Sequence, residues 1–402
     1  MTPKKSTIEL RSFHIFTLIL VVSLSSVGAI TLSSALPFIA RDLSISKEET
    51  QRLISLYMMG FAIGPLFYGP LSNRWGRKPL ILLSIALFAG GSLGCLFSFA
   101  LHSFRMMLFF RLVMALAGGG CLKMCWNMAA DVFPGKALIR ISSYYVLSFS
   151  LAPPLSIAIG GFLTQYFGWP SIFLFLALYS ALLFFFSYRL PRTLREEAKE
   201  PLILKAILKK YQATLKDSFL VMGSLILGLV TSAIYLFGTE APFISAEKIG
   251  LSPDLFGAWS LLPYLGMFLG GMSSSSLSTK CKTSSLFKLG LLIFFLSALA
   301  MVFFFFHKII TTWTLFLPVA VLLFGSSLVY CSTATLALSR AKDRSYATSI
   351  MNSLNLGTTF AFILLLEHLP TKHLLVFPLL LWAITLLTGA AGFPLHRKEQ
   401  AN

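Results

Sequence analysis

The sequence contains few charged residues for its length. Only 12% of its 402 residues are Asp, Glu, Lys or Arg, about half the share of roughly 25% in soluble domains. Hydrophobic residues account for 56%. A water-soluble fold of this length could not bury so much apolar surface, whereas a protein whose solvent is lipid need not bury it. The composition therefore excludes an ordinary soluble domain and indicates an integral membrane protein.

Residue patterns that carry catalysis or metal binding are also missing. The five cysteines form no CxxC pair, and no His/Cys spacing is typical of a metal site, so neither a metal nor a cofactor is expected. Cys121 and Cys125 share one helical face in an apolar segment, where cysteines usually just pack. The sequence has no Walker A loop, HExxH motif or GxSxG motif. It is therefore not expected to be an enzyme or an ATP-driven pump.

The alternating pattern of β-barrel strands does not recur, and the apolar runs have the length of membrane-crossing helices. The run after the basic amino-terminal stretch is too long for the apolar region of a signal peptide and lacks a convincing cleavage site, so it is interpreted as the first span. We predict an all-α polytopic membrane protein with twelve transmembrane helices, near residues 12–37, 51–72, 79–100, 105–130, 138–166, 170–190, 218–246, 254–276, 285–306, 311–338, 344–366 and 373–395.

Basic residues are distributed unevenly between the two sides of these spans. Twelve spans place both termini on one side, and the loops and tails of that side hold 24 of the 33 Lys and Arg residues. The opposite side holds seven, and Arg111 and Lys123 lie within a span. Because cytoplasmic loops carry the excess of Lys and Arg, we expect both termini in the cytoplasm of a bacterial inner membrane. The net charge of +18 is then a topology signal, and no nucleic-acid partner is expected.

One long polar connection, residues 191–217, divides the spans six and six. It separates a predicted amino-terminal six-helix bundle, residues 1–190, from a carboxyl-terminal one, residues 218–402. Its stretch KEPLILKAILKKYQATLK is basic and amphipathic. This stretch is either a surface helix on the anionic lipids of the inner leaflet or a plain linker helix.

Three sequence features recur in register between the two halves. ALPFI and EAPFI close the first and seventh spans, 205 residues apart. SLYMMGFAIGPLFYG and SLLPYLGMFLGG follow, and LSNRWGRKPLILL corresponds to LSTKCKTSSLFKL at an offset of 206 residues. Two six-helix pseudo-repeats are typical of secondary transporters, which bind a small-molecule substrate between their halves and alternate access around that site.

The segment GPLSNRWGRK, residues 69–78, resembles the signature G-x-L-x-D-R-x-G-R-[RK] of the major facilitator superfamily. Within that superfamily the chain is most similar to the Bcr/CflA drug-resistance branch. This similarity rests on RLVMALAGGGCLKMCWNMAADVFPGK, LAPPLSIAIGGFLTQYFGWPSIFLFLAL and SAEKIGLSPDLFGAW. The resemblance implies the major facilitator fold, a monomer, and an efflux antiporter of the multidrug type.

The resemblance also gives the basic segment a function, because in the family its contacts latch the two halves in one access state. Glycine permits a sharp turn between antiparallel spans, and the cations can contact the partly negative carbonyls at helix ends. Alternatively, the charges only set the topology. Asp131 can pair with Arg74 or Arg77. The candidate latch residues are Gly69, Asn73, Arg74, Gly76, Arg77, Lys78 and Asp131.

Several positions depart from the family pattern. Asn73 replaces the loop aspartate, and the first span has no acid, with Ile30 near the usual place. Met114 replaces the fourth-helix glutamine. The fifth-helix motif keeps Gly160 and Gly161 after Pro153, but Ile157 stands where the antiporter proline would be. Proton-coupled efflux of cationic drugs is therefore not assumed.

Charges within the membrane are costly, at least about 2.5–3.5 kcal/mol each, and so are candidate functional groups. Arg111 matches the fourth-helix arginine that the family uses in proton transfer and substrate binding. Lys123 either lines the cavity or extends towards the cytoplasmic interface. Glu240, two residues before Pro242, is either a proton carrier or an outer-rim residue that faces water. With two cations against one acid, we expect anionic, zwitterionic or neutral solutes.

We therefore predict a secondary-active exporter, with proton coupling as an option. An uptake carrier or facilitator for an anionic or zwitterionic solute is the alternative, and the missing acid and proline favour it. A third possibility is a membrane receptor that has kept the transporter fold but does not transport.

Overall fold

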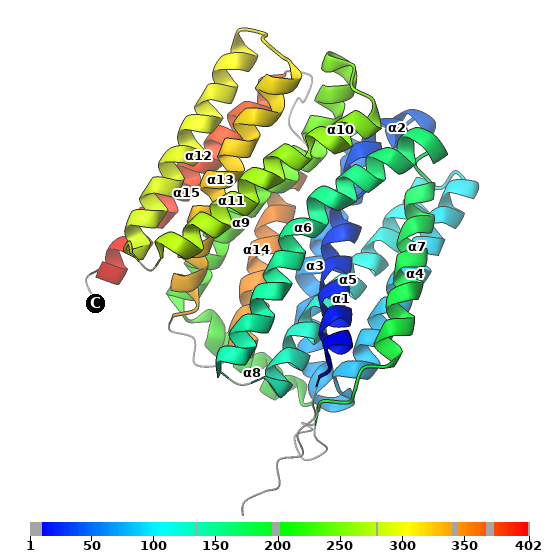
Figure 1. Ribbon diagram of the computed structural model, residues 1–402, viewed down its shortest axis with the longest axis vertical. Helices are drawn as coiled ribbons and strands as arrows, with labels where there is room; N and C mark the ends of the chain where they lie inside the picture. Colours follow the sequence, from blue (N-terminus) through cyan, green and yellow to red (C-terminus); the bar gives the residue numbers. More distant parts are fainter. Residues whose placement is uncertain are drawn as a thin grey trace, which may run out of the picture.

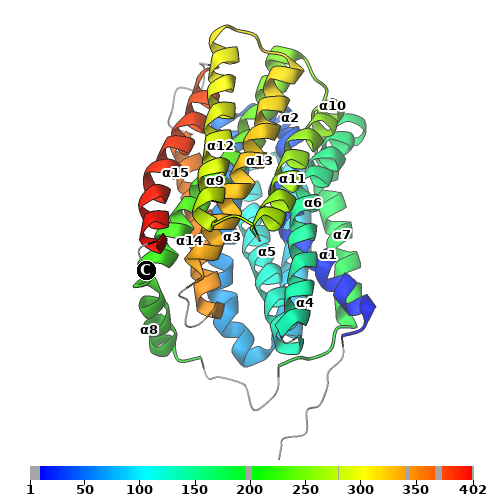
Figure 2. The ribbon, with the colours of Figure 1, turned by 60° about the vertical axis from the view of Figure 1, so that its left-hand side comes forward.

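The computed structural model describes residues 10–133, 135–194, 202–278, 280–339, 344–366 and 374–400. Throughout these residues the regular secondary structure is helical, and no strand occurs. The long helices run side by side as a bundle (Figures 1 and 2). Twelve of the described segments are long and apolar enough to cross a membrane, each within a few residues of its predicted position. The predicted all-α polytopic fold is confirmed.

The first six spans and their breaks occupy the chain up to residue 188. Their elements are α1 (Ser12–Ile30), the 3₁₀ turn η1 (Ser33–Ala35), α2 (Leu36–Asp42), α3 (Lys47–Trp75), α4 (Arg77–Ala100), α5 (Phe104–Val132), α6 (Gly135–Phe167) and α7 (Ser171–Tyr188).

A separate helix, α8 (Leu204–Leu215), lies between the sixth and seventh spans. The elements after it are α9 (Ser218–Ile244), the π-helical turn η3 (Ser245–Ile249), α10 (Pro253–Trp259), α11 (Leu261–Leu277), α12 (Thr283–Phe306), α13 (Thr312–Ala337), α14 (Arg344–Leu366) and α15 (Val376–Gln400).

The first span is not the continuous helix that its hydropathy predicts. It breaks after Ile30, passes through η1, and resumes as α2 with Pro37 in its first turn. Proline has no backbone N–H and clashes with the preceding turn, so it is tolerated at the start of a helix rather than inside one. The first span therefore consists of two helical pieces.

The predicted polar loop between the second and third spans is a single residue. Helix α3 runs to Trp75, α4 begins at Arg77, and Gly76 between them has φ of 90°. Because that backbone conformation favours glycine, the predicted sharp turn at Gly76 is confirmed. The basic residues on either side lie in helical turns rather than in a loop. We call this end of the bundle the Gly76 end, and the opposite end, where α3 begins, the Lys47 end.

Helices within each half pack mainly against one another. In the first half α4 packs on α5 and α7, α3 on α5, and α1 on α6. In the second half α13 packs on α11 and α12, and α9 on α14. Between the halves, α3 contacts α14, and α6 contacts α10 and α11. Near the Lys47 end, α2 and η1 of the first half also contact α9. These three seams are the surfaces that must move if the halves rock.

The halves approach to backbone contact near the Lys47 end. A Cβ atom on Gly161 of α6 would lie 2.3 Å from the carbonyl oxygen of Pro253, the first residue of α10. No side chain fits at that distance, so glycine is required for this approach. The α6–α10 seam is therefore closed tightly at this level.

Candidate functional site

Glu240 is buried near the carboxyl end of α9, with only 4% of its surface exposed. Its Oε2 atom lies 2.7 Å from Nζ of Lys47, and its Oε1 atom accepts a hydrogen bond of 2.6 Å from Nε2 of Gln51. The water-facing rim position, one of the two readings of the sequence, is therefore wrong. The reason is that the first turns of α3 cover the carboxylate and replace water as its partner.

This cluster joins the two halves, because Lys47 and Gln51 belong to α3 and Glu240 to α9. Lys47 and Gln51 lie four residues apart, so they project from the same face of α3. Lys47 also lies 5.3 Å from the ring centre of Phe243, one helical turn beyond Glu240. We call Lys47, Gln51 and Glu240 the outer clasp.

Lys47 is poorly placed for the helix on which it sits. It is the first residue of α3, where the positive end of the helix dipole disfavours a cation by about 0.3–1 kcal/mol. The helix is capped instead by Ser46, whose hydroxyl accepts a hydrogen bond from the backbone N–H of Glu49. The position of Lys47 is thus explained by its contact with Glu240 across the seam and not by helix stability.

Arg111 is fully buried between α1, α3 and α5. Its Nη1 donates a hydrogen bond of 2.8 Å to the carbonyl of Gly28, and its Nε donates one of 3.1 Å to the carbonyl of Leu53. Its guanidinium lies 4.4 Å from the ring centre of Tyr57, while Nη2 has no hydrogen-bond partner among the residues that the structure describes. Arg111 therefore links three helices, and its Nη2 group remains available to bind another acceptor.

Gly28 makes this arrangement possible. A Cβ atom there would lie 2.6 Å from the hydroxyl of Tyr57, which donates a hydrogen bond of 3.0 Å to the carbonyl of Ser25. A larger residue would displace the Tyr57 ring from beneath Arg111. The functional role of Arg111 stays a prediction, but its position is set by the small residue opposite it.

Arg77 forms the centre of the contacts at the Gly76 end. It bonds Asp131 through Nε at 3.0 Å and through Nη2 at 3.3 Å. Its Nη1 donates to the carbonyl of Ser72 at 2.5 Å and to the side-chain oxygen of Asn73 at 3.1 Å. The predicted pairing of Asp131 is confirmed for Arg77. The expected contact between a cation and a helix end is also confirmed, since Ser72 lies in the last turn of α3.

Asn73 takes part in this network as an acceptor, in the position where the family has a carboxylate. Asp131 also accepts a hydrogen bond of 2.9 Å from Thr193. Lys78 lies 5.4 Å from the ring centre of Tyr188, and Arg74 is exposed. Within the described residues, the side-chain hydrogen-bond partners of Arg77 all come from the first half. The network therefore fixes the α3–α4 junction within one half.

Lys123 lies beside Gly69 and not in the outer clasp. A Cβ atom on Gly69 would be 3.9 Å from Cε of Lys123 and 3.6 Å from the hydroxyl of Tyr211 in α8. Lys123 is 7% exposed. Gly69 thus lets α3, α5 and α8 approach one another near the Gly76 end.

The fifth-helix residues lie on α6, where glycine again sets the spacing. A Cβ atom on Gly160 would be 2.2 Å from the carbonyl oxygen of Thr31, between α1 and η1. Gly160 and Gly161 therefore bring α6 against both the broken first span and α10. Pro153 lies inside α6, about two turns before them.

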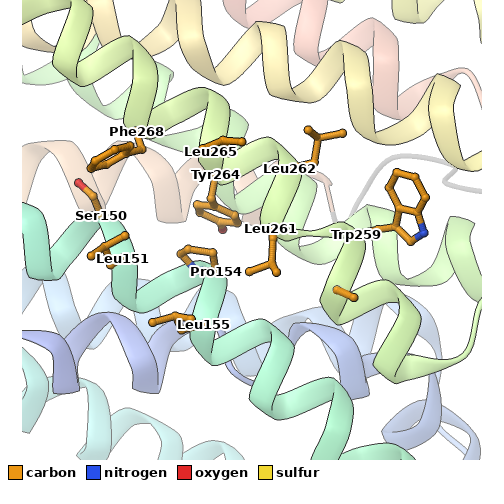
Figure 3. A pocket seen from close by; sticks show the side chains of 11 residues that line it. Ser150, Leu151, Pro154, Leu155, Trp259, Leu261, Leu262, Tyr264, Leu265 and Phe268 are labelled. Carbon is orange, nitrogen blue, oxygen red and sulfur yellow. The ribbon is translucent and has the colours of Figure 1, made fainter.

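An apolar cavity of about 620 Å³ lies between α6 and the α10–α11 segment (Figure 3). Its lining includes Leu151 and Pro154 from α6 and Trp259 and Phe268 from the second half. The hydroxyl of Tyr264, another lining residue, is buried and finds no hydrogen-bond partner in the described part of the chain. The described lining includes neither Arg111 nor Lys123 nor Glu240, so the charged cavity expected from the sequence is not the one seen here.

Comparisons with known proteins agree with the helix arrangement. A family model described as "Major Facilitator Superfamily" matches residues 18–364. A solved structure titled "Crystal structure of D-xylose-proton symporter" superposes with a TM-score of 0.73, covering 94% of this chain and 96% of that one at 14% identity. At such low identity the match concerns the fold alone.

Curated relatives include a "Bicyclomycin resistance protein homolog" of Haemophilus influenzae, 29% identical over 271 residues and 65% of each chain. An "Uncharacterized transporter" of Rickettsia felis is 30% identical over 60% of this chain and 59% of its own. "Multidrug resistance protein D" of Escherichia coli is 24% identical over 80% of each chain. The matches to the first two span less than two thirds of those relatives' own lengths.

Proposed function

The chain belongs to the major facilitator superfamily, and from this premise we propose that it is a secondary transporter that exports a small molecule by alternating access. The family consists of transporters rather than enzymes. The names of the bicyclomycin-resistance and multidrug-resistance relatives support efflux and suggest a drug or metabolite as the solute. The repeated six-span halves supply two bodies that can rock about a site between them.

We place both termini in the cytoplasm of a bacterial inner membrane. The 24-to-7 distribution of basic residues supports this orientation. It makes the Gly76 end cytoplasmic and the Lys47 end external. The outer clasp then closes the external side in the conformation described above.

The outer clasp carries the mechanistic part of the proposal. Alternating access requires α3 and α9 to separate at the external end, and this separation breaks the contacts of Glu240 with Lys47 and Gln51. An ionised Glu240 opposes the separation of α3 and α9, because Lys47 and Gln51 stabilise the buried carboxylate in place of water and are lost when the helices part. In proton-coupled export the proton binds on the external side, where the solute leaves, and is released on the cytoplasmic side. Protonation of Glu240 would neutralise the carboxylate and remove its ion pair with Lys47, so the stability of the closed external end would depend on the proton.

Glu240→Gln tests the coupling, because the amide keeps the size and one hydrogen bond but neither titrates nor pairs with Lys47. We expect purified protein in liposomes to lose pH-gradient-driven transport of a relative's drug substrate, while exchange without a gradient continues. Glu247→Gln, an exposed acid in the same region, is the matched control and should behave as the parent. Gradient-driven transport that persists in Glu240→Gln would remove Glu240 from the coupling mechanism.

A facilitator on the same scaffold is the second candidate. Ile30, near the place of the family's first-span acid, is 2% exposed, and its Cδ1 atom would lie 3.4 Å from a Cβ atom on Gly238 in α9. That position is therefore filled by hydrocarbon and offers no titratable group. In this case the parent protein would equilibrate solute with no response to an imposed pH gradient.

A further inference from the structure

Helix α8 is held at the level of the membrane surface by the chain on both sides of it. It follows the sixth span, which ends at Tyr188, and precedes the seventh, which begins at Ser218. In Figure 2 it lies at the lower end of the bundle, beside α14. A helix tethered in this way between two membrane spans meets the headgroup region of the bilayer.

Three different faces run along α8 at the helical spacing of about 100° per residue. Leu204, Leu208 and Leu215 fall within about 40° of one another, and they are 69%, 50% and 46% exposed. Lys205, Lys209 and Lys216 form an exposed basic face next to this leucine stripe. Half-buried side chains form the third face, towards the protein: Ile207, Tyr211 and Thr214.

Tyr211 connects α8 to both halves of the transporter. Its hydroxyl donates a hydrogen bond of 3.1 Å to the carbonyl of Leu66 in α3. Its ring lies edge-on to Tyr346 of α14, with the ring centres 5.0 Å apart, and Lys210 lies 5.2 Å from the same Tyr346 ring. Burial raises the pKa of the Tyr211 hydroxyl, so it remains a protonated donor across physiological pH.

We propose that α8 binds the anionic phospholipid headgroups of the adjacent leaflet, and that this binding holds Tyr211 in place between α3 and α14. The exposed leucines suit contact with acyl chains, and the basic face beside them suits contact with phosphates. A helix that faced water would not need the leucines, and a helix on a neutral surface would not need the lysines. Because Tyr211 touches both halves at the Gly76 end, the charge of the lipid controls how firmly that end stays closed.

The depth of α8 is tested with single spin labels on a cysteine-free background in vesicles that contain phosphatidylglycerol. Leu204→Cys lies on the leucine stripe, and Ala213→Cys is exposed about 180° away from it. We expect the label at residue 204 to meet oxygen dissolved in the bilayer and the label at residue 213 to meet a water-soluble nickel reagent. Equal exposure of both labels to nickel would overturn the proposal and leave α8 a plain linker helix.

The lipid charge is tested by comparing vesicles of phosphatidylcholine with and without phosphatidylglycerol. Replacing Lys205, Lys209 and Lys216 with glutamine should weaken the binding of α8 to the anionic surface of the surrounding bilayer on the order of 100-fold. The same change should abolish the effect of phosphatidylglycerol on label depth. The matched control neutralises three exposed lysines beside another junction at the same end: Lys280, Lys282 and Lys288. An equal loss in the control would refute a specific role for α8.

Tyr211→Phe separates lipid binding from the coupling to the halves. It keeps the ring on Tyr346 but removes the hydrogen bond to Leu66. Label depth at residue 204 should stay as in the parent, while the distance between labels on α3 and α14 should lose its response to phosphatidylglycerol. An unchanged response would refute the coupling. These structural readouts do not need transport, so they distinguish this proposal from a failure of the proposed function.

Discussion

The outer clasp provides the most specific prediction of the structure. Glu240→Gln removes a charge-assisted contact that bridges α3 and α9 at 2.7 Å. Hydrogen bonds to charged groups contribute about 1.5–3 kcal/mol, and the side chain of Lys47 is 21% exposed, so we take a value of about 2 kcal/mol. If this contact exists only in the externally closed state, its loss shifts the balance towards the externally open state about 30-fold.

This shift is measured as a distance between spin labels at Arg41, in α2, and Lys248, in η3, which are exposed on opposite sides of the seam. The parent should give mainly the short distance, and Glu240→Gln mainly a longer one. Lys47→Gln should produce a similar shift, and the double variant should add little, because both substitutions remove the same interaction. The exposed acid of Glu247→Gln serves as the control.

An unchanged distance distribution in both single variants would refute the reasoning, since it would show that the ion pair is not specific to one conformation. Additive effects in the double variant would also count against it. Each residue would then act through a separate contact.

Three further perturbations test the other contacts. Arg111→Ala should abolish transport. It should also lower the midpoint temperature of unfolding in detergent by a few degrees, because the carbonyls of Gly28 and Leu53 lose their donors. Arg111→Lys keeps the charge and should recover part of the stability, but it cannot bond both carbonyls in the same geometry. Asn73→Asp places a carboxylate near Nη1 of Arg77 and should strengthen that contact by about 1 kcal/mol. Because the described partners of Arg77 all belong to the first half, spin-label distances between the halves should stay as in the parent, and a shift in them would support the latch role instead. Gly161→Ala should open the α6–α10 seam, which is measured as faster labelling of cysteines placed there. Gly271→Ala should not, because a Cβ atom at Gly271 would meet no atom of the described residues within 4 Å.

The sequence was sufficient for the spans, because each required a run of apolar residues long enough to cross a bilayer. It was also sufficient for the sharp turn at Gly76. For Asp131 it left two possible partners, Arg74 and Arg77, and the structure shows that the partner is Arg77. Local patterns of this kind depend on neighbouring residues or on an adjacent helix.

Contacts between the halves could not be read in the same way. Glu240 and Lys47 are 193 residues apart, and Lys47 looked like one of seven external charges. Arg111 binds backbone carbonyls, which every residue has, so no residue type marks its partners. The break in the first span was hidden because its residues are apolar on both sides of η1.

Coupled export is the central claim, and transport under an imposed pH gradient tests it most directly. Purified protein in inside-out liposomes should accumulate a drug substrate of its relatives when the interior is acidic, and accumulation should stop when an ionophore abolishes the gradient. Uptake at the same rate with and without the gradient would contradict proton-coupled export and favour a facilitator. Absence of any flux of the relatives' substrates, with or without a gradient, in folded protein would contradict the account as a whole.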